Sequence, residues 1–169
     1  MNTFGTIKTK IETASVELYG KPEFKKYIAQ LKSMVLENKD LMISSLPDDD
    51  TLELYTIYHD CGKPFCLEID ENGKRHFPNH AEVSYKIFKQ VFNNPVAAEL
   101  ILHDMDIHLL KSDGVVQFCQ NTNALTLLLT GLAELHSNAQ MFGGLDSTSF
   151  KIKWKCINQR GKQIINQLK

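Results

Sequence analysis

The most informative stretch of this sequence reads Tyr58-His59-Asp60-Cys61-Gly62-Lys63-Pro64. It follows an apolar helical pattern and therefore places a histidine and an aspartate side by side at the end of a helix. An imidazole nitrogen beside a carboxylate oxygen suits Zn, Mn, Fe or Ni. Gly62 lets the backbone turn away at once, and Lys63 brings an ammonium group to a place where a phosphate oxygen could bind. Helix capping and a surface ion pair would explain a His-Asp pair alone better than a metal site does, whereas H-D-x-G-K-P after an apolar helix is considerably more specific.

Further histidines follow in an order that favours the metal interpretation. His80 stands at the predicted start of a helix, and His103-Asp104 stands on the helix after Pro95. His76 and His108 have less defined positions. Each histidine taken singly is also compatible with a structural role. The ordered series on several helices is what indicates a divalent-metal site, which would make water a usable nucleophile near neutral pH.

The rest of the pattern is mainly helical. Asn72-Gly73 lies between two short alternating segments and predicts one β-hairpin. Gly143-Gly144 predicts a break, and Gly161 a weak point in a partly helical tail. Apolar periodicity predicts about six helices, which cover residues 22–38, 51–59, 80–92, 95–102, 124–135 and part of 149–168.

Composition limits the class of protein. The chain has 169 residues, so we expect a single domain over residues 1–169, with a motif core at about 24–140 and a basic tail at 149–169. Its net charge of −1 argues against a protein that coats nucleic acid through overall positive charge. No signal pattern or long apolar run predicts export or membrane insertion, so we expect a cytoplasmic protein. We expect four free thiols, at Cys61, Cys66, Cys119 and Cys156.

The tail leaves two interpretations open. Its basic residues could approach a nucleic-acid backbone, or they could form an ordinary solvated helix face. These residues are Lys151, Lys153, Lys155, Arg160, Lys162 and Lys169.

With these motifs in order, residues 58–139 resemble the HD superfamily of metal-dependent phosphohydrolases. The likeness is strongest to the HD domains attached to bacterial tRNA nucleotidyltransferases, the CCA-adding enzymes. Those domains read as an apolar helix, H-D-x-G-K-P, a short hairpin, a His followed by Glu, an amphipathic helix, an Asn and another His. Here the matching residues are His59-Asp60-Cys61-Gly62-Lys63-Pro64, Asn72-Gly73, His80-Ala81-Glu82, Asn94 and His103. The resemblance implies an all-α, HD-type helical bundle with one small β-hairpin insertion.

The resemblance also implies a ligand set for a divalent ion, whether Mn, Ni, Co, Mg, Zn or Fe. The implied metal ligands are His59, Asp60, His80, His103 and Glu134. The chain departs from the family pattern at two positions. Gln30 stands where relatives carry a first histidine, and Glu134 stands where they carry an aspartate.

Two classes of function follow from the resemblance. The first is a phosphomonoesterase or phosphodiesterase acting on a nucleotide or on an RNA phosphate. In that enzyme a carboxylate, Asp60 or Asp104, would bind the attacking water, and Lys63 would neutralise charge on the phosphoryl group. The second is a non-catalytic HD-fold module that binds a nucleotide or a protein partner. A diiron oxygenase on the same fold is a third possibility that requires the histidine missing at Gln30. The sequence predicts no membrane partner and leaves the oligomeric state open.

Overall fold

The computed structural model describes residues 34–169, so the helix predicted over residues 22–38 lies largely outside the described part. The chain divides into two compact units. One unit comprises residues 47–107. The other comprises, within the described residues, 34–46 and 108–169.

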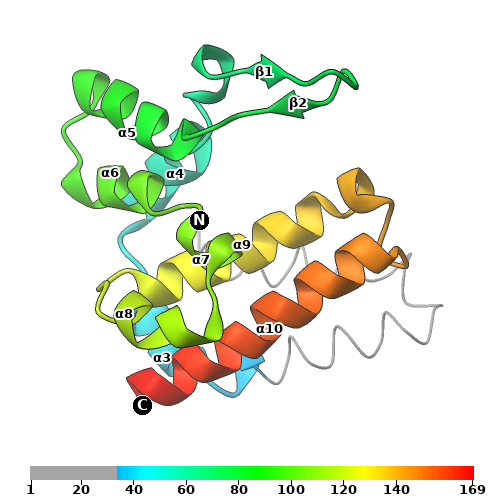
Figure 1. Cartoon of the computed structure of the whole chain (residues 1–169). Coiled ribbons are helices and arrows are strands. Elements are labelled where there is room, and N and C mark those ends of the chain that lie inside the picture. The colour runs from blue at the N-terminus through cyan, green and yellow to red at the C-terminus, as the bar shows by residue number, and fades with distance from the viewer. Residues whose placement is uncertain (1–33) are drawn as a thin grey trace. The chain divides into compact units, whose positions relative to one another are not determined.

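Three helices and a hairpin make up the unit of residues 47–107. Helices α4 and α5 both pack against α6, and the hairpin projects away from these helices (Figure 1). Their bounds are α4 (Asp49–Tyr58), the 3-10 turn η1 (Lys63–Phe65), β1 (Glu68–Ile69), β2 (Arg75–His76), α5 (His80–Val91) and α6 (Pro95–Leu102). The predicted helices and the predicted hairpin of this region are confirmed.

A chain of side-chain hydrogen bonds joins the first turns of α4 and α6. Asp48 caps α4 by accepting from the Thr51 amide at 2.9 Å and from the Thr51 hydroxyl at 2.8 Å. Asn94 caps α6 by accepting from the Ala97 amide at 2.9 Å, and its amide group donates to the Thr51 hydroxyl at 2.9 Å. Each cap therefore satisfies one open backbone donor of its helix, and the bond between Asn94 and Thr51 links the two helices to each other.

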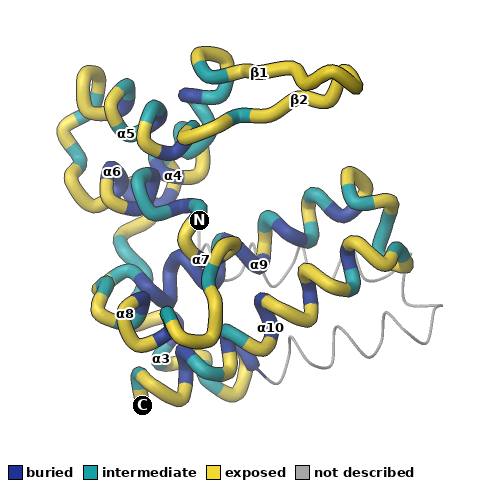
Figure 2. The backbone as a smooth tube through the Cα atoms, in the orientation of Figure 1, coloured by how far each residue is buried: buried dark blue, intermediate teal, exposed yellow. Residues whose placement is uncertain are grey.

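The hairpin has almost no core of its own. Its two strands pair antiparallel, with Glu68 opposite His76, and every strand residue is exposed, as Figure 2 shows. The turn is held by Asp70, whose carboxylate accepts from the amides of Asn72 and Lys74. Gly73 completes the turn at a φ of 75°, a conformation that glycine adopts without strain. This turn explains why Asn72-Gly73 was a reliable hairpin signal.

Two long helices dominate the other unit. Helix α10 packs against α9 and α8, and α9 is buried on nearly all sides, in keeping with its leucine-rich sequence. Helix α7 (Asp106–Leu109) spans the boundary between the units. The remaining elements are α3 (Lys39–Ser44), η2 (Ser112–Gly114), α8 (Val115–Phe118), α9 (Ala124–Ser137), η3 (Ala139–Phe142) and α10 (Thr148–Leu168).

The predicted weak point at Gly161 is wrong. Helix α10 runs without interruption through this glycine, which is buried. A Cβ at this position would lie 2.5 Å from the Met34 sulfur and 3.2 Å from a Leu128 methyl carbon. The glycine therefore permits close packing, and the contacts around it outweigh its poor helix propensity of about 1 kcal/mol. The predicted break is confirmed, since Gly143 and Gly144 both have positive φ angles.

Other expectations have mixed outcomes. The four cysteines are free thiols, as expected. Among residues 34–169, no helix has both the length and the apolar character needed to cross a bilayer. The expectation of a single domain over residues 1–169 stays a prediction.

Candidate metal centre

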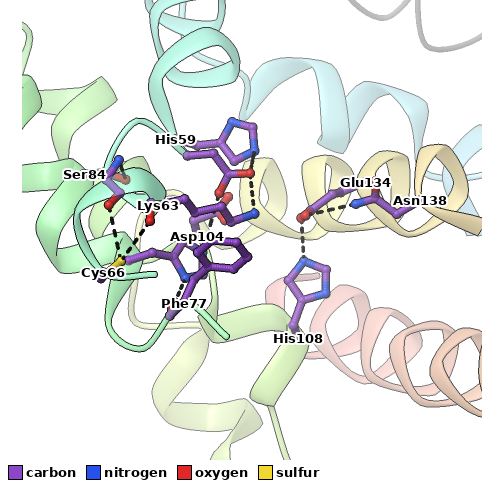
Figure 3. A network of polar contacts seen from close by, with 12 residues as sticks. His59, Lys63, Cys66, Phe77, Ser84, Asp104, His108, Glu134 and Asn138 are labelled. Carbon is purple, nitrogen blue, oxygen red and sulfur yellow. Dashed lines mark hydrogen bonds and ion pairs between the residues drawn. The ribbon is translucent and has the colours of Figure 1, made fainter. Parts of the chain in front are cut away.

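Asp60 is the centre of a polar cluster at the end of α4. Its two carboxylate oxygens face different partners: the His59 Nε2 atom lies 3.4 Å from Oδ2, and the His80 Nε2 atom lies 3.5 Å from Oδ1. The Lys63 ammonium nitrogen lies 2.5 Å from Oδ2. Figure 3 shows His59 and Lys63 within this group. The structure therefore brings together four residues that the sequence predicted to belong to one site.

Backbone carbonyls fix the orientation of both imidazoles. The Nδ1 atom of His59 lies 3.0 Å from the Thr56 carbonyl oxygen, and that of His80 lies 2.9 Å from the Phe77 carbonyl oxygen. Because a carbonyl oxygen only accepts, each Nδ1 carries a proton and donates it to the carbonyl, which leaves each Nε2 atom directed at Asp60. Metal-binding histidines are held in this way by their second nitrogen.

The donor chemistry around Asp60 therefore fits a divalent cation. A histidine Nε2 atom and a carboxylate oxygen bond to each other only through a proton or a metal ion that lies between them. Two ligands of one tetrahedral ion with bonds of about 2.1 Å lie about 3.4 Å apart, close to the separations of both histidines from the carboxylate. Within residues 34–169, however, no group of three or more His, Cys, Asp or Glu side chains is placed so that it could hold a metal ion. Residues 59, 60 and 80 thus supply the donor types that a divalent metal prefers, but their present arrangement does not form a metal site.

Gly62 brings the start of α5 against the end of α4. Its amide donates to the Ser84 hydroxyl at 2.8 Å, and Ser84 is fully buried. A Cβ on Gly62 would lie 2.5 Å from the Ser84 amide nitrogen and 2.8 Å from the His80 carbonyl oxygen. Only a glycine allows this approach, which sets the position of His80 relative to Asp60.

Lys63 is held by two groups. Besides its contact with Asp60, its ammonium lies 5.7 Å from the centre of the Phe77 ring, within the range of a cation–π interaction. Lys63 and Asp60 each keep about a third of their side-chain surface exposed, at 32% and 34%. The ammonium is therefore within reach of a ligand in solvent.

His103 and Asp104 have other partners. The Nδ1 atom of His103 lies 2.7 Å from a carboxylate oxygen of Asp106, and its Nε2 atom lies 3.6 Å from a carboxylate oxygen of Glu99. Asp104 is buried and accepts a hydrogen bond from the Tyr55 hydroxyl. This bond links α4 to the segment that follows the C-terminal end of α6, whereas the capping residues Asp48 and Asn94 lie at the N-terminal ends of α4 and α6.

Glu134 belongs to the other unit and is paired there. One of its carboxylate oxygens lies 2.9 Å from the His108 Nε2 atom, and the other accepts from the Asn138 amide at 3.3 Å (Figure 3). The sequence assigned no particular role to His108. Gln30, which occupies the place of the family's first histidine, lies outside the described residues.

The cysteine of the H-D-x-G-K-P motif is a packing residue in this arrangement. The Cys61 thiol lies 3.7 Å from the Ser84 carbonyl oxygen, and burial raises the pKa of this thiol above its ordinary value. Burial also raises the pKa of the Cys119 thiol. A raised pKa disfavours the nucleophilic thiolate, so neither cysteine is suited to nucleophilic catalysis.

The sequence profile of the HD domain matches residues 27–137, which is more than half of the chain. The chain belongs to the HD domain family. Members of this all-helical family form a superfamily of metal-dependent phosphohydrolases and generally bind divalent metals. No curated protein and no solved structure gives a match to the chain. The matched residues of this HD domain include the polar cluster around Asp60, and they end at Ser137, the last residue of α9.

Sequence reasoning missed several residues that shape the cluster. Ser84, Phe77 and Tyr55 contact site residues from distant positions, and none belongs to a recognisable motif. Ser84 offered one signal, because it follows His80 by four residues and therefore lies on the same helix face. The contact between Tyr55 and Asp104 joins residues 49 positions apart and had no local signature.

Proposed function

We propose that this HD domain is a divalent-metal-dependent phosphohydrolase whose centre is the Asp60 cluster. One observation carries the proposal: two histidines from different helices direct their Nε2 atoms at the two oxygens of one carboxylate. The backbone hydrogen bonds of both rings support it, because they occupy Nδ1 and leave Nε2 as the nitrogen that could bind a metal. An adjacent ammonium group suits the negative charge of a phosphate substrate.

In this proposal each residue has a defined task. His59, Asp60 and His80 hold the ion, and His103 is a further candidate ligand that would exchange its present partners for it. A divalent ion bound there would supply Lewis acidity toward a phosphoryl oxygen and a nucleophilic water at neutral pH. Lys63 binds the phosphoryl group and stabilises its charge.

Asp104 is the proposed residue that receives a proton from the attacking water. The Tyr55 hydroxyl would hold the Asp104 carboxylate in a single orientation, since it bonds to one of its oxygens. Positioning of this kind contributes to catalysis by restricting the approach of the reacting groups.

The proposed substrate is a nucleotide or an RNA phosphate, cleaved as a monoester or a diester. The likeness of His59–Lys63, Asn72-Gly73, His80 and His103 to the HD domains attached to tRNA nucleotidyltransferases supports an RNA substrate. A compact ammonium at Lys63 recognises phosphate as a point charge and leaves the rest of the ligand to other residues.

The test is metal analysis of protein purified without chelator, followed by a substrate panel. The panel contains a phosphomonoester, a phosphodiester, a 2′,3′-cyclic nucleotide and a short RNA, each with Mn, Ni, Co, Mg or Zn. We expect bound metal and hydrolysis of at least one substrate. Asp60→Asn keeps the shape of the side chain and removes its charge, so it should lose both metal and activity. Asp113→Asn, at an exposed aspartate of η2, is the matched control.

A second candidate function has its own supporting observation. The Lys63 ammonium already balances the charge of Asp60, which would suit a non-catalytic module that binds a nucleotide or a protein without metal. If purified protein holds no metal, takes up none on titration and hydrolyses nothing in the panel, the enzyme proposal is wrong. Binding of a nucleotide that persists in chelator would then support the module.

A further inference from the structure

Helix α10 carries positive charge without any compensating negative charge. Residues 148–169 contain six basic residues and no acidic residue, whereas the whole chain has a net charge of −1. The whole helix lies beyond the residues that match the HD domain, which end at position 137. The charge is therefore concentrated on an element that the family resemblance does not explain.

Five polar residues of α10 form one continuous exposed face. Lys155, Gln159, Lys162, Asn166 and Lys169 follow one another at intervals of three or four residues, and all five are exposed. This spacing keeps them on one side of an α-helix. The three lysines recur every seven residues, so they stand about 10 Å apart along the helix axis. We call this set the lysine–amide face.

Within the described part of the chain, the lysines of this face form no ion pairs. None of the salt bridges within residues 34–169 involves Lys155, Lys162 or Lys169. Two other basic residues of the helix do have partners, through a cation–π contact or hydrogen bonds. Lys153 lies 5.1 Å from the Phe142 ring centre, and Arg160 bonds to the Leu110 carbonyl oxygen and to Gln163. The lysine–amide face is therefore the part of α10 that is open to an anionic partner.

We propose that the lysine–amide face binds the phosphate backbone of a nucleic acid. Lysine ammonium groups and side-chain amides are the groups that proteins direct at phosphate and sugar oxygens. Their alternation along about 20 Å of helix suits a polymer with regularly spaced negative charges. The proposal concerns a surface separate from the Asp60 cluster, and it stands or falls independently of the proposed hydrolysis.

An anionic membrane is a less suitable partner for this helix. Membrane-surface helices insert an apolar face into the bilayer. The apolar residues of α10 mostly form the core of their unit, where five large ones are buried: Phe150, Trp154, Ile157, Ile164 and Ile165. Only Ile152 is an exposed large apolar residue of the helix. The face thus offers charge and hydrogen bonds but little apolar surface.

The experiment measures the salt dependence of binding to a fluorescently labelled 16-nucleotide RNA and to its duplex form. The variant replaces Lys155, Lys162 and Lys169 with Gln in the full chain. Each lost phosphate contact reduces the magnitude of the negative slope of log K against log[salt], where K is the association constant. The reduction is about 0.7 for a single strand and about 0.9 for a duplex. We therefore expect the magnitude of the slope to fall by about 2 to 3 in the triple variant, with clear loss of affinity at low salt.

A matched control separates this effect from a change in total charge. Lys74, Lys86 and Lys89 are exposed lysines of the other unit, and their replacement with Gln removes the same three charges. The control should keep the wild-type slope to within about half a unit. Circular dichroism checks that both triple variants keep their helix content.

Three results would overturn the proposal. The first is the absence of nucleic-acid binding by the wild-type chain even at 50 mM salt. The second is an equal change of slope in the two triple variants. The third is a loss of binding to phosphatidylserine vesicles in the Lys155, Lys162 and Lys169 variant while its binding to RNA is unchanged, which would assign the face to a membrane surface.

Discussion

The ammonium nitrogen of Lys63 lies 2.5 Å from Oδ2 of Asp60, on the carboxylate that also faces His59 and His80. An ammonium and a divalent ion cannot occupy the same position on one oxygen. In this structure the lysine therefore acts as the counter-ion of the carboxylate. Binding of a metal would release the ammonium from Asp60 and make it available to a phosphate.

Replacement of Lys63 by Met should strengthen metal binding. Because both side chains are about a third exposed, their interaction lies within the range of about 0.2–1 kcal/mol measured for surface pairs. The dissociation constant for Mn²⁺, measured by calorimetry, should fall by up to about fivefold. Lys86→Met, which removes the exposed partner of Glu82, should leave it unchanged. Weaker Mn²⁺ binding in Lys63→Met would contradict the counter-ion role.

Gly62→Ala should destabilise the fold and disturb the Asp60 cluster together. The added Cβ would meet backbone atoms of α5 at 2.5 and 2.8 Å, and backbone cannot rotate away as a side chain can. Overpacking of this kind costs roughly 1–3 kcal/mol. Urea unfolding should show this loss, and Mn²⁺ affinity should fall because the start of α5 carries His80. Gly114→Ala meets only a flexible leucine side chain, and an equal loss there would argue against a specific role for Gly62.

The unit that contains α9 and α10 should lose stability in mild acid because of His136. Burial lowers the pKa of His136 from 6.5 to about 4, and its Nε2 atom has no hydrogen-bond partner among residues 34–169. The Phe150 and Trp154 rings lie edge-on to it. Between pH 6.5 and 4, His136 therefore binds a proton in the unfolded chain but not in the folded chain. This effect of His136 is absent above about pH 6.5, grows between pH 6.5 and 4, and lowers the free energy of unfolding by roughly 3 kcal/mol in all.

His136→Leu tests this origin of the acid sensitivity. Leucine fills a similar space without a titratable nitrogen, so the variant should keep most of its stability between pH 6.5 and 4. Guanidinium unfolding at several pH values measures the difference. A variant as acid-sensitive as the wild type over this interval would show that another group is responsible.

Asn94→Ala should loosen two helices at once. The substitution removes the cap of α6 and the bond to the Thr51 hydroxyl in the first turn of α4. Loss of a cap alone costs about 1 kcal/mol. Hydrogen exchange should accelerate in the first turns of both α4 and α6. Faster exchange in α6 only would mean that the bond to Thr51 contributes nothing to α4.

Local signals predicted much of the fold. Asn72-Gly73, Pro95 and the apolar periodicity of residues 80–92 fixed elements whose formation depends mainly on neighbouring residues. The prediction failed at Gly161, because helix propensity is a weak local preference and the contacts with Met34 and Leu128 lie far away in the sequence. The short helices α3, α7 and α8 were also missed, since four to six residues give too little periodicity to recognise.

The candidate site was predictable only in part for a similar reason. His59, Asp60 and Lys63 are neighbours in the chain, and the ordered series of histidines added His80, which the structure places against Asp60. Pairings such as His108 with Glu134, 26 residues apart, follow from the packing of helices rather than from a motif. The roles assigned to His103, Asp104 and Glu134 stay predictions.

The bond between Gly62 and Ser84 has a consequence for protein engineering. This bond joins two residues 22 positions apart, on either side of the exposed hairpin. Both ends of the segment that carries the hairpin are therefore held in place independently of the length of the hairpin. Doubling the length of a closed loop costs only about 0.6 kcal/mol. The hairpin tip around Gly73 is therefore a natural place to graft a foreign peptide or a reporter tag, because an insertion there need not displace Asp60 or His80.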